Sequence, residues 1–124
     1  MTYKPDGYPD VSAYLLVADA EATLAFGEAA FGAERLRVIR EGGGIMHAEM
    51  RIGDSIVMMG EVPDGSPTNL HLYMADPDAA FARARDLGAA EVQPMQEKGD
   101  GDRRGGVRDP QGTVWWLSKQ VEGT

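Results

Sequence analysis

The chain has 124 residues, a net charge of −8 at neutral pH and no cysteine. This length suits one domain that buries its own core without a disulfide or a structural metal, and the missing cysteine excludes thiolate ligands and cysteine nucleophiles. The acidic charge argues against nucleic acid as a partner. No apolar stretch approaches the roughly 20 residues that cross a bilayer, and the N-terminus lacks a signal-peptide pattern. We therefore expect a single cytoplasmic domain, residues 1–124, that does not bind membranes.

Two stretches of the chain are similar to each other. Residues 14–25 and residues 71–82 each contain an apolar, strand-like run, then Ala-Asp, then an alanine-rich helical pattern. Asp19 and Asp76 are suited to accept hydrogen bonds from the free N–H groups of a helix start. A Gly-Ala pair ends each helical pattern, and its glycine suits the left-handed residue that closes a helix. The sequence therefore predicts a duplicated unit.

Three short strand patterns follow each helical pattern. They cover residues 35–40, 46–52 and 55–59 in the first copy, and residues 91–95, 104–108 and 114–118 in the second. Residues 61–68 contain two prolines and an Asp-Gly pair, which favours a connector between the copies. The order βαβββ–βαβββ predicts an α+β fold, with a first unit at about residues 9–60 and a second at about residues 69–120.

Four short motifs carry a family resemblance. They are Ala-Phe-Gly-Ala-Glu at 30–34, Met-His-Ala-Glu-Met at 46–50, Ile-Gly-Asp-Ser at 52–55 and Val-Arg-Asp-Pro-Gln-Gly-Thr-Val-Trp at 107–115. Together they resemble the glyoxalase/bleomycin-resistance/dioxygenase superfamily, also called vicinal oxygen chelate proteins, and in particular a bacterial branch often labelled demethylubiquinone-methyltransferase-like. The resemblance implies two half-barrels around a small-molecule pocket, helices on the outside, and a homodimer.

The resemblance also raises the question of a metal site. Metal-using members of the family take ligands, mostly His, Glu or Gln, from the first and last strands of each unit. The matching positions here are Ser12, Met58, Asn69 and Trp116. None of them is a usual strong ligand for a divalent transition metal. We therefore expect a metal-ligand-poor branch of the family, with no metal and no other cofactor.

Strand alternation predicts which side chains face the pocket. The candidate ligand-binding residues are Tyr14, Leu16, His47, Glu49, Met58, His71, Tyr73 and Trp116. Such a mixture of aromatic, apolar and a few polar groups is typical of a small-molecule site. Each candidate has a structural alternative. The tyrosines would fill the barrel, and Glu49 would pair with Arg40 or Arg51. A metal cluster of His47, Glu49 and His71 is a further alternative to a hydrogen-bonding role.

These features favour a binding protein that sequesters a natural product or an antibiotic, aromatic or cationic, without metal. Trp116 and the tyrosines would stack on a flat ligand, and Glu49 would meet its positive charge. The alternative is a metal-independent lyase or isomerase in which Glu49 or His71 is the general acid or base for a carbonyl compound. A metal-dependent glyoxalase- or dioxygenase-like enzyme ranks third. Methyl transfer ranks last, because no glycine-rich motif for an adenosyl cofactor occurs.

Overall fold

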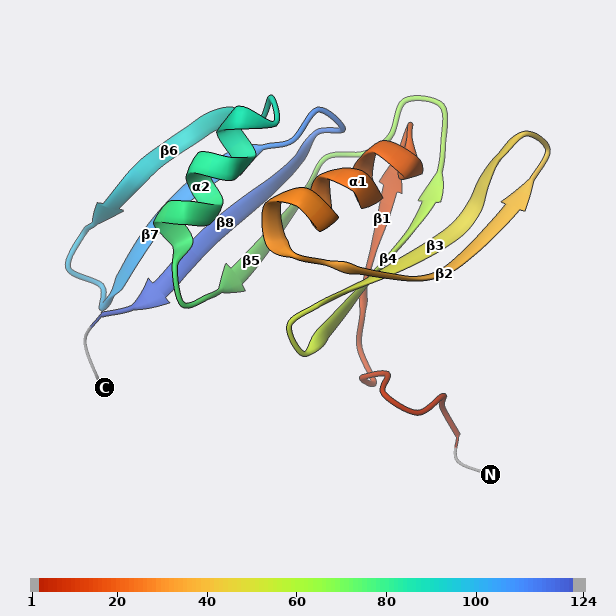
Figure 1. The fold of residues 1–124 in the computed structure, drawn as a ribbon, viewed down its shortest axis with the longest axis horizontal. Helices are drawn as coiled ribbons and strands as arrows, with labels where there is room; N and C mark the ends of the chain where they lie inside the picture. Colours follow the sequence, from red (N-terminus) through yellow and green to blue (C-terminus); the bar gives the residue numbers. More distant parts are fainter. Residues whose placement is uncertain (1–2, 122–124) are drawn as a thin grey trace. The chain divides into compact units, whose positions relative to one another are not determined.

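The computed structural model describes residues 3–121 and divides the chain into two compact units, Met1–Ser66 and Pro67–Thr124 (Figure 1). The first unit contains β1 (Ala13–Val17), α1 (Ala20–Phe31), β2 (Glu34–Glu41), β3 (Gly44–Ile52) and β4 (Ser55–Glu61). The second contains β5 (Thr68–Tyr73), α2 (Pro77–Asp86), β6 (Ala90–Glu97), β7 (Asp102–Arg108) and β8 (Thr113–Gln120). The predicted order βαβββ–βαβββ and the α+β class are confirmed.

Each unit forms one four-stranded mixed sheet with the same topology. The strand order is β1-β4-β3-β2 in the first unit and β5-β8-β7-β6 in the second. The first strand of each unit runs parallel to the last, and the other pairs are antiparallel. Tyr14 pairs with Met58 in the first sheet, and His71 pairs with Trp116 in the second. The internal repeat thus places these two pairs at equivalent positions.

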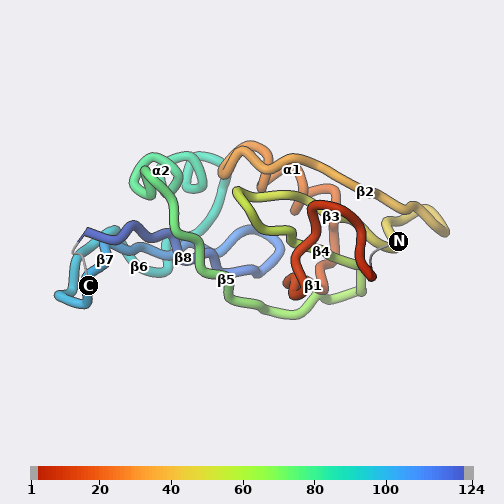
Figure 2. The backbone as a smooth tube through the Cα atoms, turned by 90° about the horizontal axis from the view of Figure 1, so that it is seen from below, coloured from red at the N-terminus to blue at the C-terminus, as the bar shows by residue number. Residues whose placement is uncertain are grey.

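Within each unit, one helix lies on one side of its sheet (Figure 2). In the first unit α1 packs closely on β3 at Gly27. A Cβ atom at this position would lie only 2.6 Å from Met50 Sδ, so a glycine is needed for this close approach. The alternation of β1 follows from this arrangement. Leu15 is buried, whereas Tyr14 and Leu16 are 49% and 41% exposed. The sheet therefore has a packed face and an open face, and Tyr14 and Leu16 belong to the open one.

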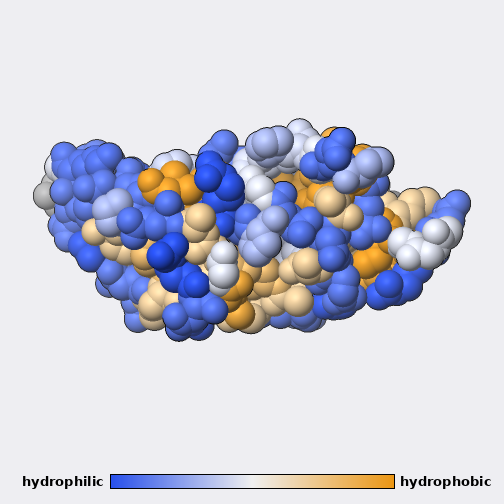
Figure 3. Space-filling model, turned by 90° about the horizontal axis from the view of Figure 1, so that it is seen from above, coloured by the Kyte–Doolittle hydropathy of each residue, from blue (hydrophilic) through white to orange (hydrophobic). Residues whose placement is uncertain are grey.

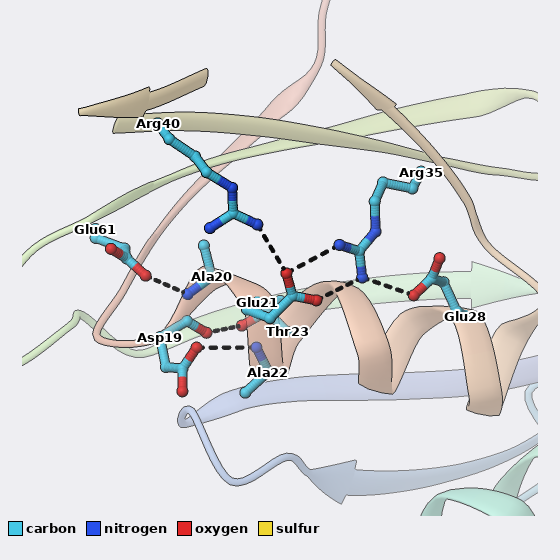
Figure 4. Close-up of polar contacts among 9 residues, drawn as sticks. All are labelled: Asp19, Ala20, Glu21, Ala22, Thr23, Glu28, Arg35, Arg40 and Glu61. Carbon is cyan, nitrogen blue, oxygen red and sulfur yellow. Dashed lines mark hydrogen bonds and ion pairs between the residues drawn. The ribbon is translucent and has the colours of Figure 1, made fainter. Parts of the chain in front are cut away.

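The start of α1 is held by two carboxylates (Figure 4). The Asp19 carboxylate accepts a hydrogen bond of 2.9 Å from the N–H of Ala22, which confirms the predicted N-cap. Glu61, at the end of β4, accepts hydrogen bonds of 2.8 Å from the N–H groups of both Ala20 and Ile45. Glu61 therefore ties the first turn of α1 to the start of β3, a contact between distant segments that local sequence patterns did not indicate.

A second group of contacts joins α1 to β2 across the same surface (Figure 4). Arg35 donates two hydrogen bonds to the Glu21 carboxylate, at 3.0 Å and 2.7 Å, and a third of 2.9 Å to Glu28. Arg40 donates to Glu21 at 3.2 Å. These side chains are partly exposed to solvent, so each ion pair adds little to stability. Their effect is to fix the helix above the strand.

The second unit repeats the helix-end chemistry of the first. Asp76 accepts a hydrogen bond of 3.1 Å from the N–H of Ala79, and Pro77 is the first residue of α2. Gly32 follows α1 with φ of 69°, and Gly88 follows the α2 cap residue with φ of 97°. Both angles lie in the left-handed region, as the Gly-Ala pairs predicted.

The turn between β7 and β8 is built around the buried carboxylate of Asp109, which is 3% exposed. Its Oδ1 accepts hydrogen bonds from the N–H groups of Gln111, at 2.8 Å, and Thr113, at 3.1 Å. Its Oδ2 accepts one of 2.8 Å from Trp115 Nε1. Trp115 is fully buried, whereas the adjacent Trp116 is only partly buried. This part of the family motif therefore carries structure, and it points Trp116 to the open face.

Among residues 3–121, no helix is both long enough and apolar enough to span a membrane. The face of the molecule drawn in Figure 3 is mostly hydrophilic, and its hydrophobic residues form small, separate groups.

Candidate functional site

The open face of the first sheet carries a series of hydrogen-bonded side chains. The Tyr8 hydroxyl donates to Glu49 Oε1. Glu49 Oε2 lies 2.7 Å from His47 Nε2, and His47 Nδ1 lies 3.1 Å from the Tyr14 hydroxyl oxygen. Met58 pairs with both Tyr14 and Glu49 in register. Strands β1, β4 and β3 thus bring four predicted site residues, Tyr14, Met58, Glu49 and His47, to one place.

The ionisation of Glu49 places one proton of this series. Glu49 is 4% exposed, and this burial raises its pKa. Hydrogen bonds from His47 and Tyr8, together with the positive charges of His47 and Arg37, outweigh burial, so the pKa of Glu49 lies below its ordinary range. An ionised carboxylate only accepts hydrogen bonds, so His47 Nε2 carries a proton. When His47 is neutral, Nδ1 is an acceptor and the Tyr14 hydroxyl donates to it. The hydrogen bond to Glu49 raises the pKa of Tyr8, which keeps its proton.

Gly60 on β4 makes room for the Tyr14 ring. A Cβ at position 60 would lie 3.0 Å from the Tyr14 hydroxyl oxygen and 3.4 Å from its Cε1. A glycine inside a strand often marks such a close approach. Tyr14 therefore lies along the sheet surface over Gly60, with its hydroxyl directed to His47.

The open face of the second sheet carries a row of aromatic rings. The six-membered ring of Trp116 lies over Gly106, where a Cβ would be 2.8 Å from two of its carbons. Trp116 Nε1 donates a hydrogen bond of 3.0 Å to Asn69 Oδ1. His71 pairs with Trp116 in register, and its ring meets that of Tyr73 edge-on at a centroid distance of 4.7 Å. Three predicted site residues therefore lie on one face of the second sheet.

Polar contacts hold the rings of this row in place. Ser118, which is fully buried, lies with its Oγ 3.0 Å from His71 Nε2 and accepts a hydrogen bond of 2.9 Å from Arg104 Nε. Arg104 also donates to Asp102 at 2.7 Å, and the Tyr73 hydroxyl donates to the same Asp102 oxygen at 2.7 Å. That hydrogen bond raises the pKa of Tyr73. The rings of His71 and Tyr73 are thus pre-organised.

The structure places all eight predicted site residues on strands, in two groups. Tyr14, Leu16, His47, Glu49 and Met58 belong to the first unit, and His71, Tyr73 and Trp116 to the second. A single pocket lined by both groups stays a prediction.

One structural alternative from the sequence is wrong. Glu49 does not pair with Arg40, which binds Glu21, or with Arg51, which donates to the carbonyl of Gly7 at 3.2 Å. Its partners are instead His47 and Tyr8. Tyr8 was missed by sequence reasoning, because it lies before β1 in a segment without a periodic pattern.

The described residues give no indication of a metal centre. Across residues 3–121, no group of three or more His, Asp or Glu side chains could hold a metal ion. In the same part of the chain, every buried side-chain nitrogen and oxygen has a hydrogen-bond partner. Of the four positions that match family metal ligands, Asn69 and Trp116 are hydrogen-bonded to each other.

The fold and these motifs agree with a comparison to known families. The family model of the Glyoxalase/Bleomycin resistance protein/Dioxygenase superfamily matches residues 11–117. The chain therefore belongs to this superfamily, as the four motifs predicted.

Individual relatives extend this result. An uncharacterized protein of Mycobacterium bovis is 36% identical over 128 residues, a match that covers 91% of this chain and 84% of that protein. The crystal structure of TioX from Micromonospora sp. ML1 superimposes with a TM-score of 0.79 and 25% identity, over 91% of this chain and 99% of that one. A putative 3-demethylubiquinone-9 3-methyltransferase, PhnB protein, from Bacillus cereus has a TM-score of 0.68 and 17% identity, over 90% and 99%. The last similarity shows the fold alone.

Proposed function

We propose that the protein binds a small planar organic ligand, such as a natural product or an antibiotic, and that binding requires no metal. The observation that carries this proposal is the position of Trp116, whose ring lies along the sheet over Gly106 and is fixed by a hydrogen bond to Asn69. A ring held in this way loses little conformational entropy when a ligand stacks on it. The superfamily contains enzymes and resistance proteins, so membership alone does not decide between them.

The neighbours of Trp116 support a stacking site. His71 and Tyr73 lie on the same face of the second sheet as Trp116. Their polar atoms are held by Ser118 and by Asp102, which Arg104 joins. Aromatic pairs favour offset or edge-on contacts with a planar partner. The net charge of −8 raises the local concentration of a cationic ligand over that of an anionic one. We therefore expect a planar cation to bind better than a planar anion of similar size.

Calorimetric titration with two dyes tests this proposal. Proflavine is a planar tricyclic cation, and anthraquinone-2-sulfonate is a planar tricyclic anion. In a chelator-containing buffer we expect proflavine to bind, and to bind more tightly than the sulfonate. Trp116→Ala should weaken proflavine binding by about 1–3 kcal/mol, because it removes the stacking surface.

The controls separate stacking from general affinity for a cation. Val92→Ala removes a partly exposed apolar side chain of β6 that is not part of the aromatic row, and should leave binding unchanged. Equal affinities of the wild type and Trp116→Ala for proflavine would contradict the proposal. Binding that disappears when the chelator is present would also contradict it.

A second candidate function is metal-independent acid–base catalysis. The sequence suggested Glu49 or His71 as the acid or base, but each oxygen of Glu49 already has a partner within the first unit. The observation that favours catalysis is different: a phenol lies at the open end of the series that begins at Glu49. An activated phenol could take part in a reaction and not only in ligand binding.

A further inference from the structure

The first unit contains a set of titratable groups that the stacking surface of Trp116 does not use. Glu49, His47 and Tyr14 are joined in series by contacts of 2.7 Å and 3.1 Å. Glu49 is 4% exposed and Tyr14 is 49% exposed, so the series runs from a buried carboxylate to an accessible phenol. The order of carboxylate, imidazole and hydroxyl is the one that orients and activates a hydroxyl group in many hydrolases.

The direction of each hydrogen bond matters for the chemistry. The ionised Glu49 accepts from His47 Nε2, and when His47 is neutral its Nδ1 therefore accepts from the Tyr14 hydroxyl. The remaining lone pairs of the Tyr14 oxygen are then available to a ligand, and its own proton already has an acceptor.

We propose that Tyr14, His47 and Glu49 form a proton-transfer site for a small carbonyl compound that carries an acidic C–H or enol O–H group, with Tyr14 as the catalytic residue. The ligand proton passes to the Tyr14 oxygen while the Tyr14 proton passes to His47 Nδ1. The electron pair of the broken bond stays on the ligand as an enolate, and the reverse transfer at a different ligand atom completes an isomerisation. Glu49 is a positioning residue that compensates the imidazolium charge.

Two arginines act on the buried end of the series, and the proposed reaction takes place at the other end. The positive charges of Arg37 and Arg51 oppose the rise in the pKa of Tyr8. The charge of Arg37 also helps to lower the pKa of Glu49. The inference does not depend on the proposed stacking function, because it rests on other residues in the other unit.

The other exposed tyrosines of the chain provide an internal comparison. Tyr3 is 84% exposed and donates to Asp10, and Tyr73 is 65% exposed and donates to Asp102. Both hydrogen bonds raise the pKa of the phenol. A carboxylate is also a weaker base than an imidazole. If exposure alone decided the reaction with an electrophile, Tyr14 would be the slowest of the three tyrosines to react. If the proposed series activates it, Tyr14 should be the fastest.

Labelling with benzenesulfonyl fluoride tests the inference without knowledge of the natural substrate. The Tyr14 oxygen attacks sulfur and forms an S–O bond, its proton passes to His47 Nδ1, the S–F bond breaks, and fluoride leaves. Mass spectrometry of the intact protein and of fragmented peptides gives the rate at each tyrosine. We expect Tyr14 to react before Tyr3 and Tyr73.

Variants identify the cause of the reactivity. His47→Gln should slow labelling of Tyr14 by about 10²-fold, the lower range of general-base effects, while labelling of Tyr3 and Tyr73 in the same molecule stays constant. Glu49→Gln should slow the labelling of Tyr14 less than His47→Gln does. Glu49→Asp, which keeps a carboxylate, should label Tyr14 faster than Glu49→Gln. Glu41→Gln, at an exposed position of β2, is the matched control and should change nothing.

The same measurements can overturn the inference. Labelling in the order of exposure, with Tyr3 and Tyr73 ahead of Tyr14, would contradict it. So would an unchanged Tyr14 rate in His47→Gln that keeps the circular dichroism spectrum of the wild type. If His47→Gln does not fold, the Glu49→Gln and Glu49→Asp rates decide the question, since equal rates in both and in the wild type would exclude the series.

Discussion

The six-membered ring of Trp116 lies so close to Gly106 that an added Cβ would be 2.8 Å from two ring carbons. Gly106→Ala therefore forces the indole away from the sheet. We expect a loss of about 1–3 kcal/mol in the free energy of unfolding, the usual cost of overpacking, together with a change in tryptophan fluorescence. Urea denaturation measures the first effect.

A double-mutant cycle shows whether this cost comes from the contact itself. In a Trp116→Ala background the alanine at position 106 has no ring to displace, so Gly106→Ala should then cost much less. Additive costs of the two substitutions would mean that the ring and the glycine do not interact.

Asp109 is predicted to be a structural residue, although it lies within a family motif. Asp109→Ala leaves the buried indole N–H of Trp115 and the N–H of Thr113 without their acceptor. A buried donor without a partner costs about 1–3 kcal/mol, so we expect a loss of at least that size in urea denaturation. Asp64→Ala, at an exposed position of the connector, should stay within about 0.5 kcal/mol of the wild type. Similar values for both variants would refute this role.

Glu61 is predicted to stabilise the first unit by bridging two elements. Its carboxylate accepts from the N–H of Ala20 in α1 and from that of Ile45 in β3. Glu61→Ala removes both acceptors and should cost about 1–2 kcal/mol, comparable to a lost helix cap. Thermal denaturation of Glu61→Ala beside Glu41→Ala, an exposed position of β2, provides the comparison. Equal melting temperatures would contradict the bridge.

The hydrogen bonds of Glu49 predict a pH dependence of stability. Burial raises the pKa of Glu49, but its partners lower it further, so the folded-state pKa lies below the unfolded value of about 4.3. The contribution of Glu49 is then fully present above the ordinary carboxyl range and is lost as the pH falls through the folded-state pKa. Glu49→Gln lacks this term, so the stability gap between wild type and variant should narrow from neutral pH to about pH 3.

The acid limb of the wild type alone is not diagnostic, because other carboxylates also have lowered pKa values. Glu21 and Asp78 are held by Arg35 and Arg103, and they contribute in the same direction. Glu21 and Asp78 contribute equally to the wild type and to Glu49→Gln, so their contributions drop out of the difference in stability between the two proteins. A gap that stays constant across the same pH range would show that Glu49 has no shifted pKa in the folded state.

The fold could be predicted from the sequence because its signals are local and occur twice. Asp19 and Asp76 begin the helices, glycines end them, and alternation in β3 separates Met50 from Glu49. A repeat of such signals leaves few alternatives for the order of elements. Glu61 was not predicted, because its two partners are distant in sequence and carry no mark of the contact.

The candidate site was predicted less completely, for the same reason. Strand alternation placed Tyr14, His47 and Glu49 on one face, but their hydrogen-bond order depends on register and rotamers that no short pattern encodes. Tyr8 comes from an irregular segment and gave no signal. Gly60 was a usable sign, since a glycine inside a strand often marks a close approach.

The most direct test of the stacking proposal is the response of the two indole N–H signals in a proton–nitrogen NMR spectrum during titration with proflavine in a chelator-containing buffer. Trp116 lies on the open face of the second sheet. Trp115 is fully buried and donates a hydrogen bond to Asp109, so Trp115 is the control within the same molecule. We predict that the Trp116 signal shifts progressively to saturation and that the Trp115 signal stays in place. An unchanged Trp116 signal at proflavine concentrations that saturate the calorimetric titration would contradict the proposal.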